Sequence, residues 1–560
     1  MGRGSTAYCP SCLEVGARLR RVRRLTVFIE SDNLARLIVP CLANGRDAVA
    51  PLPSGLQPSL PTGQLVNRPA NPQSTFALLH RSSAPICTFA LSRSASPLAP
   101  LPTCQLAPWQ PPMSFLISRF SSWADKPAMA GAWGATTFGE LTALLVKVRA
   151  ELKALSIHQP TAFALIGEHG PASTAWLLAL EEAGHFVAPL SGNVAEHPKK
   201  LTQINVQWVI TSEPLTWKMF PRVDEPSTHP LFNKLREQSR AGLILFSSGT
   251  SGQPKAMVQD FTTLLATYDS RHPSRLPLLA LLGFDHIGGI NTLLGALASG
   301  AMLVIPENRS AQAVAAAIAA HRVGVLPASP TFLNLLLASG EAQACDLSSL
   351  RVITYGTEPM PETLLGRLRQ AFPQARFIQT FGTSETGIAR TESPEAGSTF
   401  FRFSDSGLKW KIIDEELWLQ SRTQIGGYLN ANSERFTEDG WFRTGDKAEL
   451  GPNGTLRISG RVGEMINVGG EKLMPTEVES VILGIDGVTE CRVFGENHAL
   501  TGQTVAVDVV ASGNPDQESL RAKIRTICRT KLARYKVPTR VNFVSSVSGE
   551  RMKKLCKIST

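Results

Sequence analysis

The segment Leu243-Ile-Leu-Phe-Ser-Ser-Gly-Thr-Ser-Gly-Gln-Pro-Lys-Ala256 carries the strongest chemical signal in this 560-residue chain. Its first four residues are apolar and predict a short buried β-strand. The strand runs into a loop made of hydroxyl residues, glycines and one lysine: Ser247, Ser248, Gly249, Thr250, Ser251, Gly252 and Lys255. Glycines let backbone N–H groups gather around an anion, hydroxyls add hydrogen bonds, and the lysine adds a positive charge. The segment therefore predicts a cradle for the phosphates of a nucleotide.

The same composition would also suit a flexible connector between a strand and a helix. It does not fit the Walker A loop, in which Gly, four residues and then Gly-Lys-Ser/Thr follow one another. Here Pro254 precedes Lys255, and Ala256 follows it. The sequence thus gives no support to a P-loop kinase or ATPase.

Charge is unevenly distributed along the chain, which has a formal net charge of +10. Residues 1–112 hold 11 arginines, no lysine and 4 acidic residues, a net of +7, which leaves only +3 for the remaining residues. The main body therefore predicts no basic face for nucleic acid. The apolar stretch 288–306 is interrupted by Asn291, Ser299 and glycines, so we expect buried α/β core there and no transmembrane segment.

Residues 1–112 differ from the rest in being rich in proline and serine and lacking hydrophobic periodicity, which predicts disorder. They could be a transit peptide or a regulatory tail. Alternatively, translation begins at Met113, and residues 1–112 were assigned to the chain by an incorrect choice of start codon. The complete absence of lysine favours the last explanation.

From Met113 onward, apolar strand-like runs alternate with helical stretches. Such alternation predicts an α/β fold with a parallel sheet covered by helices, in which ligands bind beyond the carboxyl ends of the strands. After residue 460 the pattern changes to a smaller α+β unit, with a capping box expected at Thr476-x-x-Glu479. We therefore expect three parts: a disordered or mis-started 1–112, a large domain at 113–460 with parallel-rich sheets covered by helices, and a small mobile α+β domain at 461–560.

The loop 247–255 matches the phosphate motif of the adenylate-forming enzymes, which comprise acyl-CoA synthetases, adenylation domains and luciferases. A second segment, Phe381-Gly-Thr-Ser-Glu-Thr-Gly387, resembles the Tyr-Gly-x-Thr-Glu motif of that superfamily. The resemblance implies that Glu385 holds Mg²⁺, that Ser384 approaches the α-phosphate, and that the ring of Phe381 stacks on adenine. Gly382 and Thr383 complete this part of the implied nucleotide site.

Three further segments appear in the order of the same family. Gly440-Trp-Phe-Arg-Thr-Gly-Asp446 is similar to its Thr-Gly-Asp motif, which assigns Asp446 to the ribose hydroxyls, and Arg461 is a second implied ribose contact. Between them, Asn453-Gly454 predicts the turn of a hairpin. The segment 460–472 resembles the interdomain hinge, with Gly463 where the family usually has Asp or Lys.

Leu532-Ala-Arg-Tyr-Lys-Val-Pro538 resembles an element of the family's small domain, and the catalytic lysine then falls at Lys554. The match around it is weak, so Lys553 or Lys557 could be the functional residue instead. His286 lies at the family's acyl-pocket position, and the resemblance places Gly356, Thr357 and Glu358 along the acid and nucleotide site.

The resemblance implies a two-step reaction with ATP and Mg²⁺: a small carboxylic acid becomes an acyl-adenylate, and the acyl group then passes to a thiol. We expect that thiol to be CoA, as in a fatty-acid or aryl-acid CoA ligase, and similarity around residues 417–420 and 426–428 favours the small-acid ligases of the o-succinylbenzoate type. The alternatives are an enzyme that loads a carrier-protein phosphopantetheine and a non-catalytic homologue that binds nucleotide. We further expect a cytoplasmic protein without nucleic-acid partners.

Overall fold

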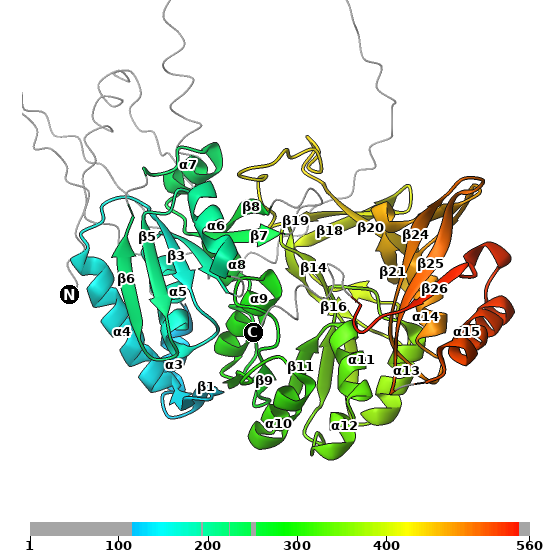
Figure 1. The fold of residues 1–560 in the computed structure, drawn as a ribbon. Helices are drawn as coiled ribbons and strands as arrows, with labels where there is room; N and C mark the ends of the chain where they lie inside the picture. Colours follow the sequence, from blue (N-terminus) through cyan, green and yellow to red (C-terminus); the bar gives the residue numbers. More distant parts are fainter. Residues whose placement is uncertain (1–114, 192–193, 223–224, 248–253, 514, 548–560) are drawn as a thin grey trace, which may run out of the picture. The chain divides into compact units, whose positions relative to one another are not determined.

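The computed structural model describes residues 115–191, 194–222, 225–247, 254–513 and 515–547 (Figure 1). Residues 1–110 and 111–560 form separate units, and all of the elements below belong to the second. Ser248, Gly249, Thr250, Ser251, Gly252, Lys553, Lys554 and Lys557 lie outside the described residues, as do all of residues 1–112, on which the predicted disorder falls.

The first part of the large domain is a six-stranded sheet in the order β6-β5-β3-β4-β7-β8. Strands β3, β4, β5 and β7 are parallel, while β6 and β8 pair antiparallel at the two edges. The bounds are β3 Ala162–Ile166, β4 Phe186–Leu190, β5 Trp208–Ser212, β6 Trp217–Pro221, β7 Gly242–Ser247 and β8 Lys255–Asp260.

A second, seven-stranded sheet follows in the order β13-β12-β11-β9-β10-β1-β2, parallel except for the β1–β2 hairpin. Its strands are β1 Pro127–Gly131, β2 Gly134–Thr137, β9 Leu278–Leu279, β10 Leu303–Val304, β11 Val325–Ala328, β12 Val352–Tyr355 and β13 Arg376–Gln379. The parallel-rich α/β architecture expected from the sequence is confirmed.

Successive side chains of these strands point to opposite faces of each sheet, and most are apolar on either face. Helices therefore cover the two sheets. One core lies among α3 Phe115–Ser122, α4 Phe138–Ala154, α5 Pro171–Glu182, α8 Phe261–Ala266 and α9 Ile287–Ser299. A second lies beneath α10 Ala311–His321, α11 Pro330–Ala338, α12 Glu341–Ala344 and α13 Glu362–Ala371. A third includes residues of α6 His197–Gln203 and α7 Pro230–Glu237. The predicted buried core at 288–306 is confirmed by α9 and β10, and none of the helices in the described part of the chain combines the length and apolar character needed to cross a bilayer.

Antiparallel strands complete the large domain. Strands β14 Phe381–Thr383 and β15 Gly387–Ala389 form a tight hairpin, and β16 Thr391–Glu392 pairs with β17 Arg402–Phe403. Strands β18 Leu408–Ile413, β19 Glu416–Ser421, β20 Phe442–Leu450 and β21 Leu456–Arg461 form a four-stranded sheet. The turn predicted at Asn453-Gly454 is present, with φ of +56° and +71° at the two residues, but the connection between β20 and β21 is longer than two residues.

The small C-terminal α+β part places α14 Pro475–Ile482 and α15 Gln517–Lys531 against a five-stranded sheet. The strands are β22 Ile466–Val468, β23 Glu471–Leu473, β24 Val488–His498, β25 Gly502–Ala511 and β26 Arg540–Phe543. The predicted capping box at Thr476 and Glu479 is wrong. The helix is capped instead at Met474, whose N–H donates to Glu477 Oε1 at 3.1 Å, while Thr476 Oγ1 donates to the Ser459 carbonyl at 2.7 Å.

Candidate functional site

The predicted phosphate loop joins two antiparallel strands, β7 and β8, which pair from Gly242 with Asp260 to Ser247 with Lys255. This register brings the two ends of the loop together. Asn430 holds the second end, because its Oδ1 accepts the N–H of Ala256 at 2.8 Å and its Nδ2 donates to the carbonyl of Pro254 at 2.9 Å. The described ends of the loop, Ser247 and Lys255, are therefore fixed side by side.

Tyr428 connects Lys255 with Glu385. The Lys255 ammonium lies 4.8 Å from the centre of the Tyr428 ring, and the Tyr428 hydroxyl donates to Glu385 Oε1 at 2.8 Å. Burial, followed by the charge of Glu385, raises the pKa of the Tyr428 hydroxyl above its ordinary value, so this hydroxyl stays a donor. The structure thus brings together the lysine of the loop and the predicted magnesium ligand through a tyrosine that the sequence reasoning did not place there.

The turn of the β14–β15 hairpin presents Ser384 and Glu385. Thr383 Oγ1 accepts the N–H of Thr386 at 3.1 Å, and the carbonyl of Glu385 accepts the N–H of Ile425 at 2.9 Å. Gly382 is crowded, since a Cβ there would lie 2.6 Å from the carbonyl oxygen of Gly387. These contacts hold the backbone that carries both predicted catalytic side chains.

Phe381 begins the same hairpin. Its ring is stacked on Phe401, with centroids 6.2 Å apart, and meets Phe403 edge-on at 5.9 Å. Adenine stacking on Phe381 therefore stays a prediction for the ring face turned away from Phe401.

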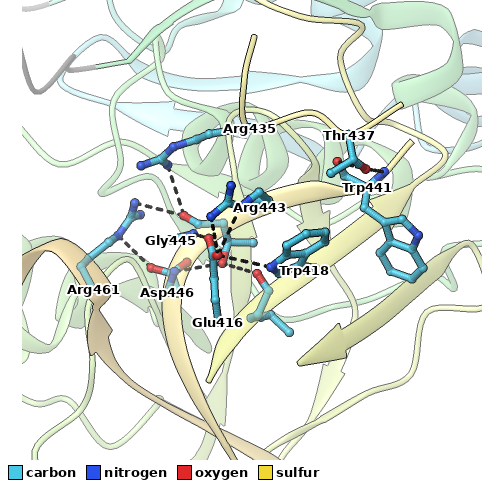
Figure 2. A network of polar contacts seen from close by, with 11 residues as sticks. Glu416, Trp418, Arg435, Thr437, Trp441, Arg443, Gly445, Asp446 and Arg461 are labelled. Atoms are coloured by element: carbon cyan, nitrogen blue, oxygen red, sulfur yellow. Dashed lines mark hydrogen bonds and ion pairs between the residues drawn. The ribbon is translucent and has the colours of Figure 1, made fainter. Parts of the chain in front are cut away.

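Asp446 and Arg461 are direct partners across β20 and β21. Arg461 Nε lies 2.7 Å from Asp446 Oδ1, and Asp446 is buried (Figure 2). Burial raises the pKa of Asp446 to about 6, although Arg461, Thr444 and Arg435 act in the opposite direction. The negative charge of Glu385 also raises this pKa, so the predicted ribose contact and the predicted magnesium ligand are close enough to interact.

Glu416 of β19 supports the part of strand β20 that precedes Asp446. Its Oε1 accepts the N–H of Gly445 at 2.9 Å, and its Oε2 accepts hydrogen bonds from Trp418 at 3.2 Å and Arg443 at 3.4 Å (Figure 2). Gly445 has φ of +74°, a conformation that glycine adopts without steric cost. A glutamate at the first position of a strand carries no local sequence signal of this role.

His286 and residues 356–358, which the sequence also predicts as part of the site, lie on other elements. His286 precedes α9, with its Nε2 3.9 Å from Asp285 Oδ1, and Asp285 accepts the Ser191 hydroxyl at 2.6 Å. In the segment after β12, Gly356 packs closely on Thr380 and Thr357 has φ of +73°. The Glu358 carboxylate accepts the N–H of Thr331 in the first turn of α11 at 2.7 Å, so part of its bonding capacity is used within the fold.

Magnesium chemistry fits Glu385. Among the described residues no group of three or more His, Cys, Asp or Glu side chains could hold a metal ion. Mg²⁺ commonly takes only one or two carboxylates and completes its shell with substrate phosphates and water. Glu385 uses one carboxylate oxygen for Tyr428, which leaves the other for such an ion.

The fold is that of an α/β protein in which the two described ends of the predicted phosphate loop, Glu385 and the Asp446–Arg461 pair belong to one connected group of side chains. The family model for the AMP-binding enzyme matches residues 118–427, and the model for the AMP-binding enzyme C-terminal domain matches residues 477–554. The chain belongs to the AMP-binding enzyme family. The predicted superfamily and two-part fold are thereby confirmed.

Similar proteins include acid–CoA ligases. The long-chain-fatty-acid–CoA ligase FadD13 of Mycobacterium tuberculosis is 31% identical over 338 residues, which cover 56% of this chain and 66% of that ligase, just under two thirds. The 2-succinylbenzoate–CoA ligase of Listeria monocytogenes serotype 4b is 25% identical over 73% of this chain and 91% of its own length. The fold resembles that of the anthranilate CoA ligase AuaEII in complex with anthranoyl-AMP, with a TM-score of 0.66, 20% identity, and coverage of 78% of this chain and 93% of that one.

Proposed function

We propose that this protein uses ATP to convert a carboxylic acid into an acyl-adenylate and then transfers the acyl group to the thiol of CoA. The observation that carries the proposal is the contact from Lys255 through Tyr428 to Glu385, beside the buried Asp446–Arg461 pair. The similarity to FadD13 and to the 2-succinylbenzoate ligase supports CoA as the acceptor. We keep the cytoplasm as the proposed location.

In the first step a carboxylate oxygen of the acid attacks the α-phosphorus of ATP, and the bond to the pyrophosphate leaving group breaks. The nucleophile is already anionic, so the step needs positioning and charge neutralisation more than proton transfer. The Lys255 ammonium neutralises negative charge on the phosphates, while the Ser384 hydroxyl donates a hydrogen bond to the α-phosphate. Asp446 accepts hydrogen bonds from the ribose hydroxyls, and Arg461 fixes the Asp446 carboxylate.

Glu385 is the residue that would hold Mg²⁺, which when bound neutralises charge on the phosphates. The remaining positions of the phosphate loop bind phosphate oxygens through N–H groups and hydroxyls. The segment Gly356, Thr357 and Glu358, with Phe381, borders the adenine, and His286 borders the acid. We propose these roles together with a boundary between the large and the small domain at residues 460 and 461.

The experiment is ATP–pyrophosphate exchange with a panel of aryl, short-chain and medium-chain acids, followed by addition of CoA or of an acyl carrier protein. We expect exchange with at least one acid and thioester formation with CoA. Thioester formation only on the carrier protein would change the acceptor, and the absence of exchange with every acid would contradict the proposal.

Lys554→Ala tests the lysine assignment in the same assay. We expect exchange to fall by about 10²- to 10³-fold, the usual cost of removing a preorganised charge donor from a transition state. Lys553→Ala and Lys557→Ala are the matched comparisons, and a larger loss in either of them would move the catalytic role to that lysine.

A further inference from the structure

A small cavity lies beside the β14–β15 hairpin, between that hairpin and the segments around α8 and α9. Its lining includes Tyr268 after α8, Asn291 of α9 and the strand residues Gly387–Ala389. Its volume is about 30 Å³, which is room for about two water molecules or for one carboxylate group. The space therefore suits a polar head group better than a long apolar chain.

Three arginines line this cavity, against a single acidic residue. Arg271, Arg390 and Arg422 face it together with Asp405. Within the ranges that the structure describes, none of the three arginines forms an ion pair with a carboxylate. The nearby Asp269 is already paired with Arg119, at 3.4 Å. The cavity thus has an excess of positive charge.

Two of these arginines are held in place by uncharged groups. Arg390 donates to the hydroxyl of Ser270 at 2.8 Å and to the carbonyl of Thr267 at 3.3 Å. The Arg271 guanidinium lies 5.7 Å from the centre of the Tyr268 ring. Both side chains are exposed at the rim, so they can exchange water for an entering anion.

The charges of Arg271 and Arg390 both influence the buried hydroxyl of Tyr268. Its hydroxyl donates to Asn291 Oδ1 at 2.8 Å. Burial raises the pKa of this hydroxyl above its ordinary value, and the charges of Arg271 and Arg390 act against that shift. Because burial dominates, Tyr268 stays protonated and supplies no negative charge to balance the two arginines.

The cavity is close to the predicted reaction centre. The hairpin that forms one of its walls carries Ser384 and Glu385 in its turn. Arg390 follows Glu385 by five residues, so their Cα atoms are at most about 17 Å apart. Thr386 and Gly387, which directly follow Glu385 in the chain, line the cavity together with Arg390, so the cavity and the predicted reaction centre share one hairpin.

We propose that Arg271 and Arg390 bind a second carboxylate at the far end of the acid, so that the preferred substrates are short dicarboxylic acids. This inference rests on the proposed acid–CoA ligase function. Guanidinium groups are planar and match a carboxylate with two parallel hydrogen bonds. An acid with an uncharged far end would displace water from the arginines without replacing those bonds.

The test compares two acids that differ by one carboxylate. We would measure kcat/KM in pyrophosphate exchange for 2-succinylbenzoate and for 3-benzoylpropanoate, which lacks the ring carboxylate, and for octanedioate against octanoate. We expect the dicarboxylic acid of at least one pair to be preferred by about 10- to 100-fold, the range for hydrogen bonds to a charged group. Arg271→Met and Arg390→Met should remove most of that preference by raising KM for the dicarboxylic acids, while kcat/KM for the monocarboxylic acids does not fall and can rise, because the arginines no longer have to lose water.

Lys409→Met is the matched control, because Lys409 is an exposed cation on neighbouring β18 that does not line the cavity. Its preference should equal that of the unmodified protein. Equal rates for the two acids of both pairs, or an equal loss for both acids in the arginine variants, would overturn the inference alone. A lack of exchange with every acid would overturn the proposed function and this inference with it.

Discussion

Tyr428 determines how much of the Glu385 carboxylate is available to other partners. Its hydroxyl binds one carboxylate oxygen at 2.8 Å, and the same ring lies against the Lys255 ammonium. The Tyr428 side chain is buried, so both contacts are electrostatically stronger than the same contacts would be in water. One residue thereby positions both a cation and an anion of the candidate site.

Tyr428→Phe separates these two contacts, because it keeps the ring under Lys255 and removes the donor to Glu385. We expect exchange activity to fall about tenfold, in line with the loss of a hydrogen bond to a charged acceptor, and the Mg²⁺ concentration for half-maximal activity to change. The measurement is a Mg²⁺ titration of pyrophosphate exchange. Tyr535→Phe in the small domain is the control, and an unchanged Mg²⁺ response in Tyr428→Phe would remove this tyrosine from the site.

We expect the buried Asp446 to make ATP binding sensitive to pH. Burial raises its pKa from 3.8 to about 6 in the folded protein, so between these values the folded chain binds a proton that the unfolded chain lacks. The contribution of this group to the free energy of unfolding is therefore fully present below about pH 4 and is lost as the pH rises through 6. Ribose binding has the opposite dependence, since only the ionised carboxylate is a pure acceptor.

We accordingly expect KM for ATP to rise as the pH falls below about 6, measured by exchange at saturating acid. Asp446→Ala should raise KM for ATP at pH 8, and Asp446→Asn should flatten the dependence between pH 5 and 7. A KM for ATP in Asp446→Ala equal to that of the unmodified protein would exclude this residue from the ribose site.

Single strands show which parts of the fold can be predicted from sequence. Runs such as β3 and β7 are recognised because uninterrupted apolar residues fit a strand buried on both faces. The apolar run 278–284 likewise has the composition of one buried strand, but β9 is only Leu278–Leu279. The carbonyls of Leu281 and Leu282 bond instead to Arg309 Nε at 2.9 Å and to His169 Nε2 at 3.0 Å. Such distant side-chain partners leave no local pattern.

The candidate site divides in the same way. Glu385 and Asp446 lie in motifs with fixed local spacing, whereas the contacts of Tyr428 and Asn430 join residues 43 to 176 positions apart. Strand β8 was not predicted, and Nε2 of its buried Gln259 donates to the distant carbonyl of Thr423 at 2.8 Å. Local sequence therefore predicts the residues that would contact a ligand. It predicts less well the residues that hold those side chains in position.

Asn430 gives an element-scale prediction, because it ties the segment after Tyr428 to the start of β8. Asn430→Ala removes two hydrogen bonds to the end of the phosphate loop. We expect a several-fold higher KM for ATP and a loss of about 1 kcal/mol in the free energy of unfolding, since the side chain is exposed to solvent. Asn432→Ala is the control, as Asn432 is exposed and its Nδ2 bonds only to nearby Glu434 in the contacts described. Equal KM values in the two variants would contradict the role of Asn430.

At the scale of the whole molecule, contacts cross the predicted boundary between residues 460 and 461. Asn334 of α11 donates to the carbonyl of Thr489 at 2.6 Å, and Thr363 of α13 donates to the carbonyl of Ser480 at 3.0 Å. The expected hinge residue Gly463 lies in a short 3₁₀ turn, where an added Cβ would meet nothing within 4 Å. Gly463 is thus sterically replaceable in this arrangement, and its proposed use as a hinge concerns movement between arrangements.

The start of the folded unit lends itself to a direct test. The family model begins at residue 118, and the compact second unit begins at Pro111. Helix α3 buries Leu116 and Phe120 in the core, with the Phe120 ring 5.1 Å from that of Phe138. We therefore expect a chain that starts at Met113 to keep the thermal midpoint of the longer chain, together with its exchange activity. A chain that starts at Asp125 lacks α3, and losing two fully buried side chains should cost several kcal/mol of the free energy of unfolding and lower the midpoint. Loss of exchange activity in the chain that starts at Met113 would instead assign a working role to the first 112 residues.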